Sequence, residues 1–109
     1  MPSRTQRAAA GAAFWIEKLN EAPGAFVYAE LTRNRIGELE IRFVCDWLQD
    51  GKYMQVKSQR LDYWMPSKLR QYEITELLLL NLHRERSEKM MGLGEDETIG
   101  DLELPPLPF

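Results

Sequence analysis

The sequence predicts an α+β fold: a helix, an antiparallel meander of three or four strands, a long second helix and an extended tail. Apolar residues recur at helical spacing near both ends of the body, and they alternate with a period of two between these segments. An Asp-Gly pair separates two alternating segments, which is typical of a β-hairpin. At 109 residues the chain is long enough for one domain, which we place at 1–92, followed by a tail at 93–109.

The first helix is expected from Thr5 to about Asn20. This stretch is rich in alanine and in other good helix formers, and its apolar residues fall three and four positions apart. Pro23 and Gly24 then end the helix, because proline cannot continue the hydrogen-bond ladder and glycine accepts a turn conformation.

Three strands are expected at 25–32, 38–48 and 52–64, with a polar loop before Gly37 and a tight turn at Asp50 and Gly51. The second strand alternates with one buried side, formed by Leu39, Ile41, Phe43, Cys45 and Trp47. If Met54 and Val56 of the third strand join this core, Tyr53 and Lys57 face outward.

The second helix has a start signal at Pro66 and Ser67, and Thr75 marks the start of a stronger segment. Arg84 to Lys89 are expected to form a solvated charged end, and Gly92 is expected to terminate the helix. The apolar face of this helix is expected to contain Leu77, Leu78, Leu80 and Leu82.

The formal net charge of −3 is unevenly distributed along the chain. Five acidic residues and no basic residue follow Gly92, so the tail contributes −5, and fourteen bases against twelve acids give the body +2. The longest apolar run, 77–80, is far below the roughly 18 residues that a membrane span needs. We expect a cytoplasmic protein, or one of the host cytoplasm if it is viral. Arg4 and Arg7, which precede small apolar residues, leave organelle targeting open.

The sequence does not predict an enzyme, and we expect no cofactor and no metal. Cys45 alternates in phase with core residues, and His83 is expected on a helix surface. One cysteine and one histidine do not provide the four ligands of a structural zinc site. The sequence contains no glycine-rich phosphate loop and no nucleophile elbow.

A binding function is better supported. An outward tyrosine between basic residues is suited to single-stranded nucleic acid, because the ring stacks on bases for about 1–3 kcal/mol and the cations follow the phosphates. The residues expected on this face and its rim are Arg33, Arg35, Arg42, Lys52, Tyr53, Lys57, Arg60 and Trp64.

The end of the chain, ELPPLPF after GEDETIGD, resembles the C-terminal peptide of bacterial single-stranded DNA-binding proteins in its acidic lead-in and its final Pro108-Phe109. The resemblance implies that the tail recruits a protein partner through Leu107, Pro108 and Phe109. An apolar ring can enter a pocket while the acidic residues meet bases around it.

The body resembles the positive-cofactor-four coactivators and the related Whirly sheets. IGELEIRFVCDWLQDGKYMQVKSQRL corresponds to their strand pair and YEITELLLLNLHRERSEKM to their helix. The resemblance implies single-strand binding by a homodimer, which here would form through the leucine-rich helix. The bases that correspond are Arg42, Lys52, Lys57 and Arg60.

A second hypothesis is a protein interaction or assembly subunit, such as a host-factor inhibitor or a component of a larger complex, that does not bind nucleic acid. A third is a structural domain whose tail has no role. A basic and aromatic outward sheet face favours nucleic acid, whereas an acidic face favours the assembly subunit.

Overall fold

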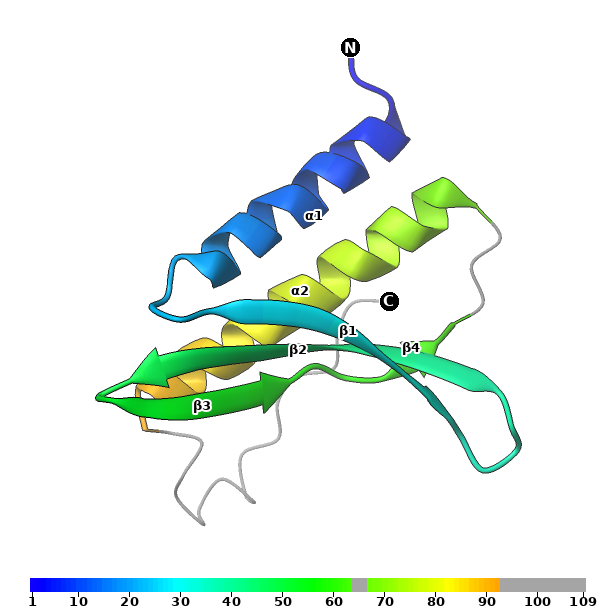
Figure 1. Cartoon of the computed structure of the whole chain (residues 1–109). Coiled ribbons are helices and arrows are strands. Elements are labelled where there is room, and N and C mark those ends of the chain that lie inside the picture. Colours follow the sequence, from blue (N-terminus) through cyan, green and yellow to red (C-terminus); the bar gives the residue numbers. More distant parts are fainter. Residues whose placement is uncertain (64–66, 93–109) are drawn as a thin grey trace.

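The computed structural model describes residues 1–63 and 67–92. It contains a helix, a four-stranded antiparallel sheet and a second helix (Figure 1), so the predicted α+β class is confirmed. The elements are α1 (Arg4–Asn20), β1 (Phe26–Arg33), β2 (Leu39–Gln49), β3 (Lys52–Lys57), β4 (Leu61–Asp62) and α2 (Lys68–Met90). The predicted extended tail lies outside the described residues.

Both helices begin at a serine N-cap, which was predicted for α2 at Ser67 but not for α1. Ser3 accepts a hydrogen bond from the backbone N–H of Gln6, whose side chain accepts one from the Ser3 N–H, which forms a capping box at α1. Ser67 accepts from the Arg70 N–H at α2. Helix α2 is continuous, so Thr75 does not begin a separate helix. Gly92, with φ at 81°, follows its C-terminus as predicted.

The sheet has the order β1-β2-β3, and the short β4 pairs with β2 beyond the end of β3. Asp50 and Gly51 adopt φ values of 53° and 78°, which confirms the predicted tight turn between β2 and β3.

The expected strand at 52–64 is interrupted after Lys57. The β2–β3 register pairs Cys45 with Val56, whereas the β2–β4 register pairs Ile41 with Leu61, so one additional residue is accommodated between them. The Ser58 hydroxyl accepts from the Phe43 N–H at 2.9 Å, and the Gln59 N–H donates to Asn81 of α2 at 3.0 Å. Hydrogen bonds at the bulge therefore connect it both to β2 and to α2.

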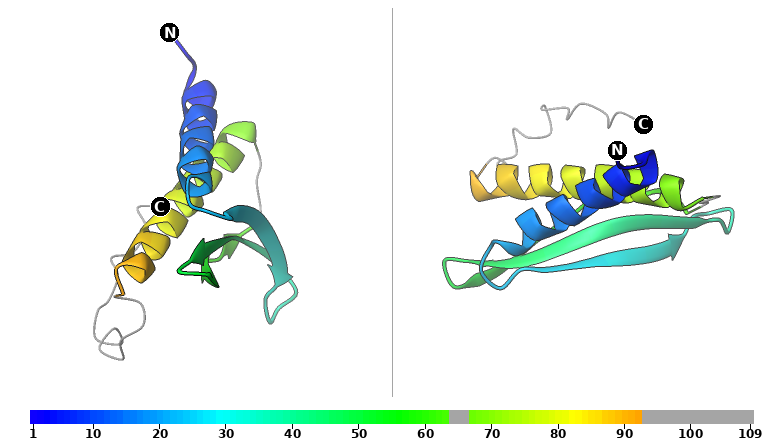
Figure 2. Two further views of the ribbon diagram at one scale, coloured as in Figure 1. Left: turned by 60° about the vertical axis from the view of Figure 1, so that its left-hand side comes forward. Right: turned by 90° about the horizontal axis from the view of Figure 1, so that it is seen from above.

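Both helices cover one face of the sheet, and the other face is open (Figure 2). The two helices run parallel, because Arg4 bonds to Glu73 near their starts and Arg86 bonds to Leu19 near their ends. The core between helices and sheet is formed by Ala12, Leu19, Cys45, Trp47, Val56, Leu79 and Leu82, with a smaller cluster of Ile41, Ile74 and Leu78.

The core contains two leucines of α2 that were expected to be available for dimerisation. Leu78 and Leu82 of the expected apolar face are fully buried within a single chain, as is Leu79, which was not expected on that face. The expectation of a solvated charged end at 84–89 is wrong at Arg86, which is 5% exposed. His83 was expected on the surface but is half-buried against Trp15, with ring centroids 5.2 Å apart.

Candidate binding face of the sheet

The open face of the sheet carries side chains from all four strands. Strand pairing places Phe26, Tyr28 and Glu30 of β1 opposite Asp46, Val44 and Arg42 of β2, on the side away from the helices. On β3, Tyr53, Gln55 and Lys57 share this side, because their neighbours Met54 and Val56 pack toward the core. We call this surface the outer face. Its members are Phe26, Tyr28, Glu30, Thr32, Glu40, Arg42, Val44, Asp46, Leu48, Tyr53, Gln55, Lys57 and Asp62, with Arg60 from the bulge.

Aromatic rings lie at two places on the outer face. Phe26 is 61% exposed and Tyr53 is 75% exposed. Phe26 packs beside Tyr28 with ring centroids 5.4 Å apart and the ring planes inclined at 37°. Large apolar rings exposed to this extent are a common feature of protein interfaces and of base-stacking surfaces.

Polar side chains between the rings are linked by hydrogen bonds. The Gln55 side-chain amide donates to the Asp46 carboxylate at 2.8 Å and to the Tyr28 hydroxyl at 3.4 Å. The network fixes the rotamer of Gln55 and joins β1, β2 and β3 across the face. Val44 lies between these residues and is fully buried, although it faces away from the helices. The outer face is therefore a packed surface and not a layer of free side chains.

Arg42 forms an ion pair with Glu30. Its Nε and Nη2 atoms donate to the Glu30 carboxylate at 2.8 and 2.5 Å, and its side chain is only 16% exposed. The hydrogen bond from Arg42 lowers the pKa of Glu30, and the positive charges of Lys57 and Arg60 act in the same direction. A guanidinium held in this way has few donors left for a phosphate.

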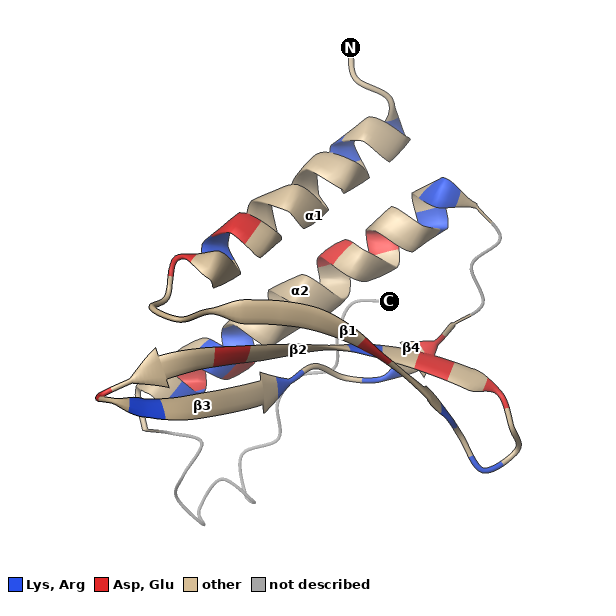
Figure 3. Cartoon of the chain, viewed as in Figure 1, with Lys and Arg blue, Asp and Glu red and all other residues tan. Residues whose placement is uncertain are grey.

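The charges of the outer face nearly cancel. Both signs are interspersed along the strands (Figure 3). The basic side chains on the face are Arg42, Lys57 and Arg60, and the acidic ones are Glu30, Glu40, Asp46 and Asp62. The face is therefore aromatic, as the nucleic-acid hypothesis expects, but it is not basic.

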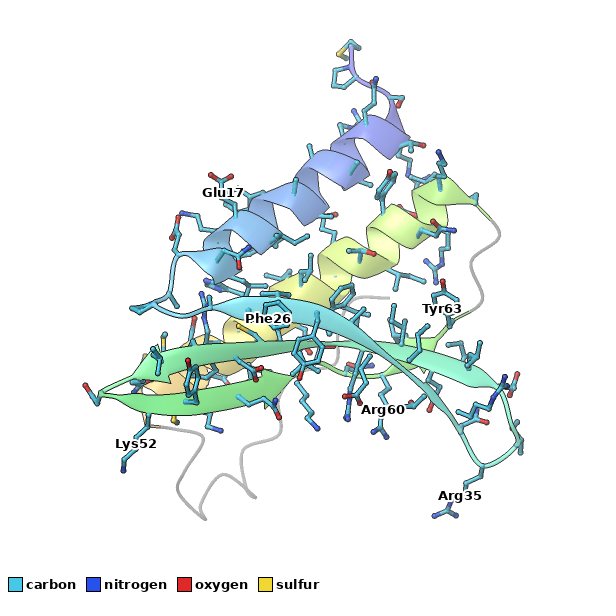
Figure 4. The ribbon with its side chains drawn as sticks, in the orientation of Figure 1. Glu17, Phe26, Arg35, Lys52, Arg60 and Tyr63 are labelled. Carbon is cyan, nitrogen blue, oxygen red and sulfur yellow. The ribbon has the colours of Figure 1, made fainter. Side chains whose placement is uncertain are left out.

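The eight residues expected to bind nucleic acid do not form one cluster. Tyr53, Lys57 and Arg42 share the outer face as expected. Lys52, on the alternate side of β3, and Arg35 lie at opposite ends of the sheet (Figure 4). Arg33 faces the helix side of β1, and its Nη1 donates to the Gly37 carbonyl at 2.7 Å. Trp64 lies outside the described residues, as do Leu107, Pro108 and Phe109.

The bulge after Lys57 changes the position of Arg60. Simple alternation places Arg60 on the core side together with Met54 and Val56. In the structure its side chain is exposed, and its charge acts on Glu30 of the outer face. Two members of the face, Phe26 and Tyr28, were not expected there. Both sides of β1 contain apolar residues, so the alternation within 26–33 does not identify the exposed side.

The single cysteine and the single histidine both lie away from the outer face. Cys45 is fully buried, and this burial raises the pKa of its thiol although Arg86 is nearby. Burial against Trp15 also lowers the pKa of His83. Near the turn between β1 and β2, at the end of the sheet opposite to Asp50 and Gly51, an open depression of 330 Å³ is lined by Arg33, Glu38, Leu39, Asp62 and Tyr63.

Among the residues that the structure describes, neither α1 nor α2 has the length and hydropathy of a membrane span. Comparisons of the chain with protein-family models, with curated proteins and with solved structures gave no significant match.

Proposed function

We propose that the chain is a non-enzymatic assembly subunit that docks a protein partner on the outer face of its sheet. One observation carries the proposal: exposed rings at Phe26 and Tyr53 accompany charges of both signs that nearly cancel. Aromatic residues are enriched in the cores of protein interfaces, and charged residues of both signs form their rims. A polyanion, in contrast, would meet four carboxylates on this surface.

The proposal that the chain is not an enzyme rests on the positions of its single cysteine and its single histidine. Cys45 is fully buried, and His83 packs against Trp15. Neither group is placed to meet a substrate on the outer face, which lies on the opposite side of the sheet from the helices.

The acidic tail has a complementary role in this proposal. Leu107, Pro108 and Phe109 form a second contact, in which an apolar chain end enters a pocket of a basic partner. Two linked contacts of moderate affinity bind more tightly than either contact alone when both can engage together.

Site-specific photo-crosslinking tests the docking face. A photoreactive phenylalanine analogue replaces Tyr53 on the outer face, and the matched control replaces Phe14, which is 49% exposed on α1. In extract of the source cells, we expect a discrete crosslinked protein from position 53 and not from position 14. The purified partner should then lose at least about tenfold in affinity for the Phe26→Ala, Tyr53→Ala double variant. Equal crosslinking from both positions, or unchanged affinity, would exclude this face.

The second candidate function is binding of single-stranded nucleic acid. It is favoured by Lys57 and Arg60, whose side chains are exposed and whose charges act on Glu30 of the same face. Titration with oligo-dT at two salt concentrations tests it, with a logarithmic slope of about −0.7 per phosphate contacted. Charge reversal of Lys57 and Arg60 should abolish binding, whereas reversal of Arg7 on α1 should not. Absence of saturable binding at low salt excludes this candidate.

A further inference from the structure

Strand β1 forms an open edge of the sheet. Within the described residues it pairs only with β2, and no described element lies beyond it in either view of Figure 2. Its eight residues, FVYAELTR, contain neither proline nor lysine, and the register from Phe26 to Arg33 is regular and without a bulge. Long regular edges are usually protected by lysine, proline or bulges, because they expose hydrogen-bonding groups that can pair with another strand.

The β1–β2 pairing shows which backbone N–H and C=O groups of β1 point away from the sheet. The Asn34 N–H donates to the Glu38 carbonyl at 2.9 Å, in the same register that pairs β1 with β2. Hydrogen-bonded pairs alternate along an antiparallel ladder, so the even-numbered residues of β1 bond to β2. The N–H and C=O groups of Val27, Ala29, Leu31 and Arg33 therefore point away from the sheet.

The sequence of β1 is complementary to itself in an antiparallel register centred on Ala29. Residues that pair must share a face, so only registers that match odd with odd and even with even residues are available. A register centred on Ala29 places Val27 opposite Leu31 and Tyr28 opposite Glu30 of the other strand. A register centred on Glu30 would instead place two carboxylates opposite each other, which is unfavourable.

Helix α1 presents an apolar side above the same edge. Arg4, Gly11 and Trp15 face α2, where they contact Glu73, Glu76 and His83. With 3.6 residues per turn, the opposite side of α1 carries Ala9, Ala13 and Ile16. Helix α1 contacts β1 and α2, whereas α2 contacts β2 and β3, so α1 lies on the β1 side of the helix layer.

An exposed apolar residue lies on β1 and another on α1, so each could be covered by the second copy. Leu31 is 51% exposed and Ile16 is 39% exposed. In the Ala29-centred register, Leu31 of each copy lies next to Val27 of the other, which packs against the core cluster beneath α1. The pairing would therefore cover each Leu31 with the Ile16 side of the second copy's α1.

We propose that two copies of this chain pair antiparallel through β1, with Ala29 on the two-fold axis. The two sheets form one continuous sheet, with all four helices on one face and two outer faces side by side on the other. This inference goes beyond the proposed docking of a partner and does not depend on it, because the strand edge and the outer face are different surfaces.

The molar mass of the full chain in solution tests the proposal. Sedimentation equilibrium over a range of concentrations should give twice the 12.7 kDa of one chain. Leu31→Lys places a charge at the edge and should reduce the mass to that of one chain. The matched control, Ile36→Lys in the turn after β1, removes a 78% exposed aliphatic residue and should remain dimeric. Circular dichroism spectra should show that both variants are folded.

Disulfide crosslinking tests the register. Ala29→Cys should form a crosslinked dimer on oxidation, because the two copies of residue 29 face each other with Cα atoms about 5.5 Å apart. Glu30→Cys should not crosslink, and the wild-type chain is the control because its Cys45 is fully buried. A single-chain mass at every concentration, or a dimer unaffected by Leu31→Lys, would overturn the proposal. Preferential crosslinking at residue 30 would overturn the register.

Discussion

The guanidinium of Arg86 in α2 donates a hydrogen bond to the backbone carbonyl of Leu19, at the C-terminal end of α1. A second donation reaches the carbonyl of Lys18 at 3.1 Å, and the side chain is buried without a carboxylate partner in the described ranges. The last carbonyls of a helix lack intrahelical donors and carry its negative partial charge. The buried cation is thus stabilised by a helix end and not by an acid.

Replacing this arginine should destabilise the fold. In Arg86→Met the carbonyl of Leu19 loses the Arg86 donor and that of Lys18 keeps only the Glu21 N–H, and we expect a loss of about 1–3 kcal/mol in the free energy of unfolding. Urea unfolding with a constant m-value measures it. The control is Arg84→Met, a half-buried arginine of the same helix, which should change stability by less than about 0.5 kcal/mol. Equal losses would show that the hydrogen bonds to α1 contribute nothing.

The pKa of His83 gives stability a specific pH dependence. Burial lowers the pKa of the folded histidine, with the charges of Arg86 and Lys18 adding to the effect. The unfolded state therefore binds the proton more readily, and stability should fall as the pH drops from about 6.5 toward the folded pKa. Urea midpoints between about pH 8 and pH 5 should show a fall that is smaller in His83→Gln. Parallel curves for both proteins would contradict this assignment.

The ion pair between Arg42 and Glu30 on the outer face should make the stability of the fold depend on pH in acid. Because Arg42 lowers the pKa of Glu30, this pair stabilises the fold above the usual glutamate pKa of about 4.3, and its contribution disappears as the pH falls through the lower folded value. At neutral pH the wild-type chain should have a higher urea midpoint than Glu30→Gln, and the two should converge in acid. Glu17→Gln, on the exposed side of α1, is the control (Figure 4).

A double-mutant cycle can measure the close contact between the helices at Gly11. A Cβ atom added there would lie 1.6 Å from Oε2 of Glu76, so Gly11→Ala requires that this carboxylate move. In a Glu76→Ala background the three atoms nearest to this Cβ are removed, so the intrinsic helix preference of alanine over glycine should give a gain of about 0.5–1 kcal/mol. In the wild-type background the gain should be smaller. Equal gains would show that Glu76 moves at no cost.

Deletion of Phe109 tests the tail separately from the body. Loss of the terminal ring should leave the urea midpoint unchanged, together with any binding by the outer face, and should abolish only the second contact with the partner. Calorimetric titration of the purified partner with both proteins measures this change. A deletion that lowers the urea midpoint would instead show that the ring contributes to the stability of the body.

The order of elements was predictable because local signals specify it. Pro23 and Gly24 end α1, Asp50 and Gly51 close the hairpin, and period-two alternation identifies the core side of β2. The bulge after Lys57 was not predictable, since it depends on a hydrogen bond between Gln59 and Asn81, which lies 22 residues further along the chain. That bulge also determines on which side of the sheet Arg60 lies.

The burial of Arg86 was equally inaccessible from the sequence. In the charged segment RERSEK a basic residue is expected to be solvated. Its hydrogen-bond acceptors come from the end of α1, whose position the local sequence does not reveal. For the outer face, sequence alternation correctly placed Tyr53 and Lys57. It could not show that Glu30 of a different strand occupies the donors of Arg42.

The parallel arrangement of α1 and α2 has a consequence for the order in which the chain can fold. Leu19 leaves the ribosome early, but two groups that contribute to its burial, Leu82 and Arg86 of α2, are synthesised more than sixty residues later. The β2–β3 hairpin is local and can form first, whereas α1 exposes its apolar side until α2 arrives. Newly made chains therefore pass through a stage with an uncovered helix, during which binding by a chaperone would protect them from aggregation.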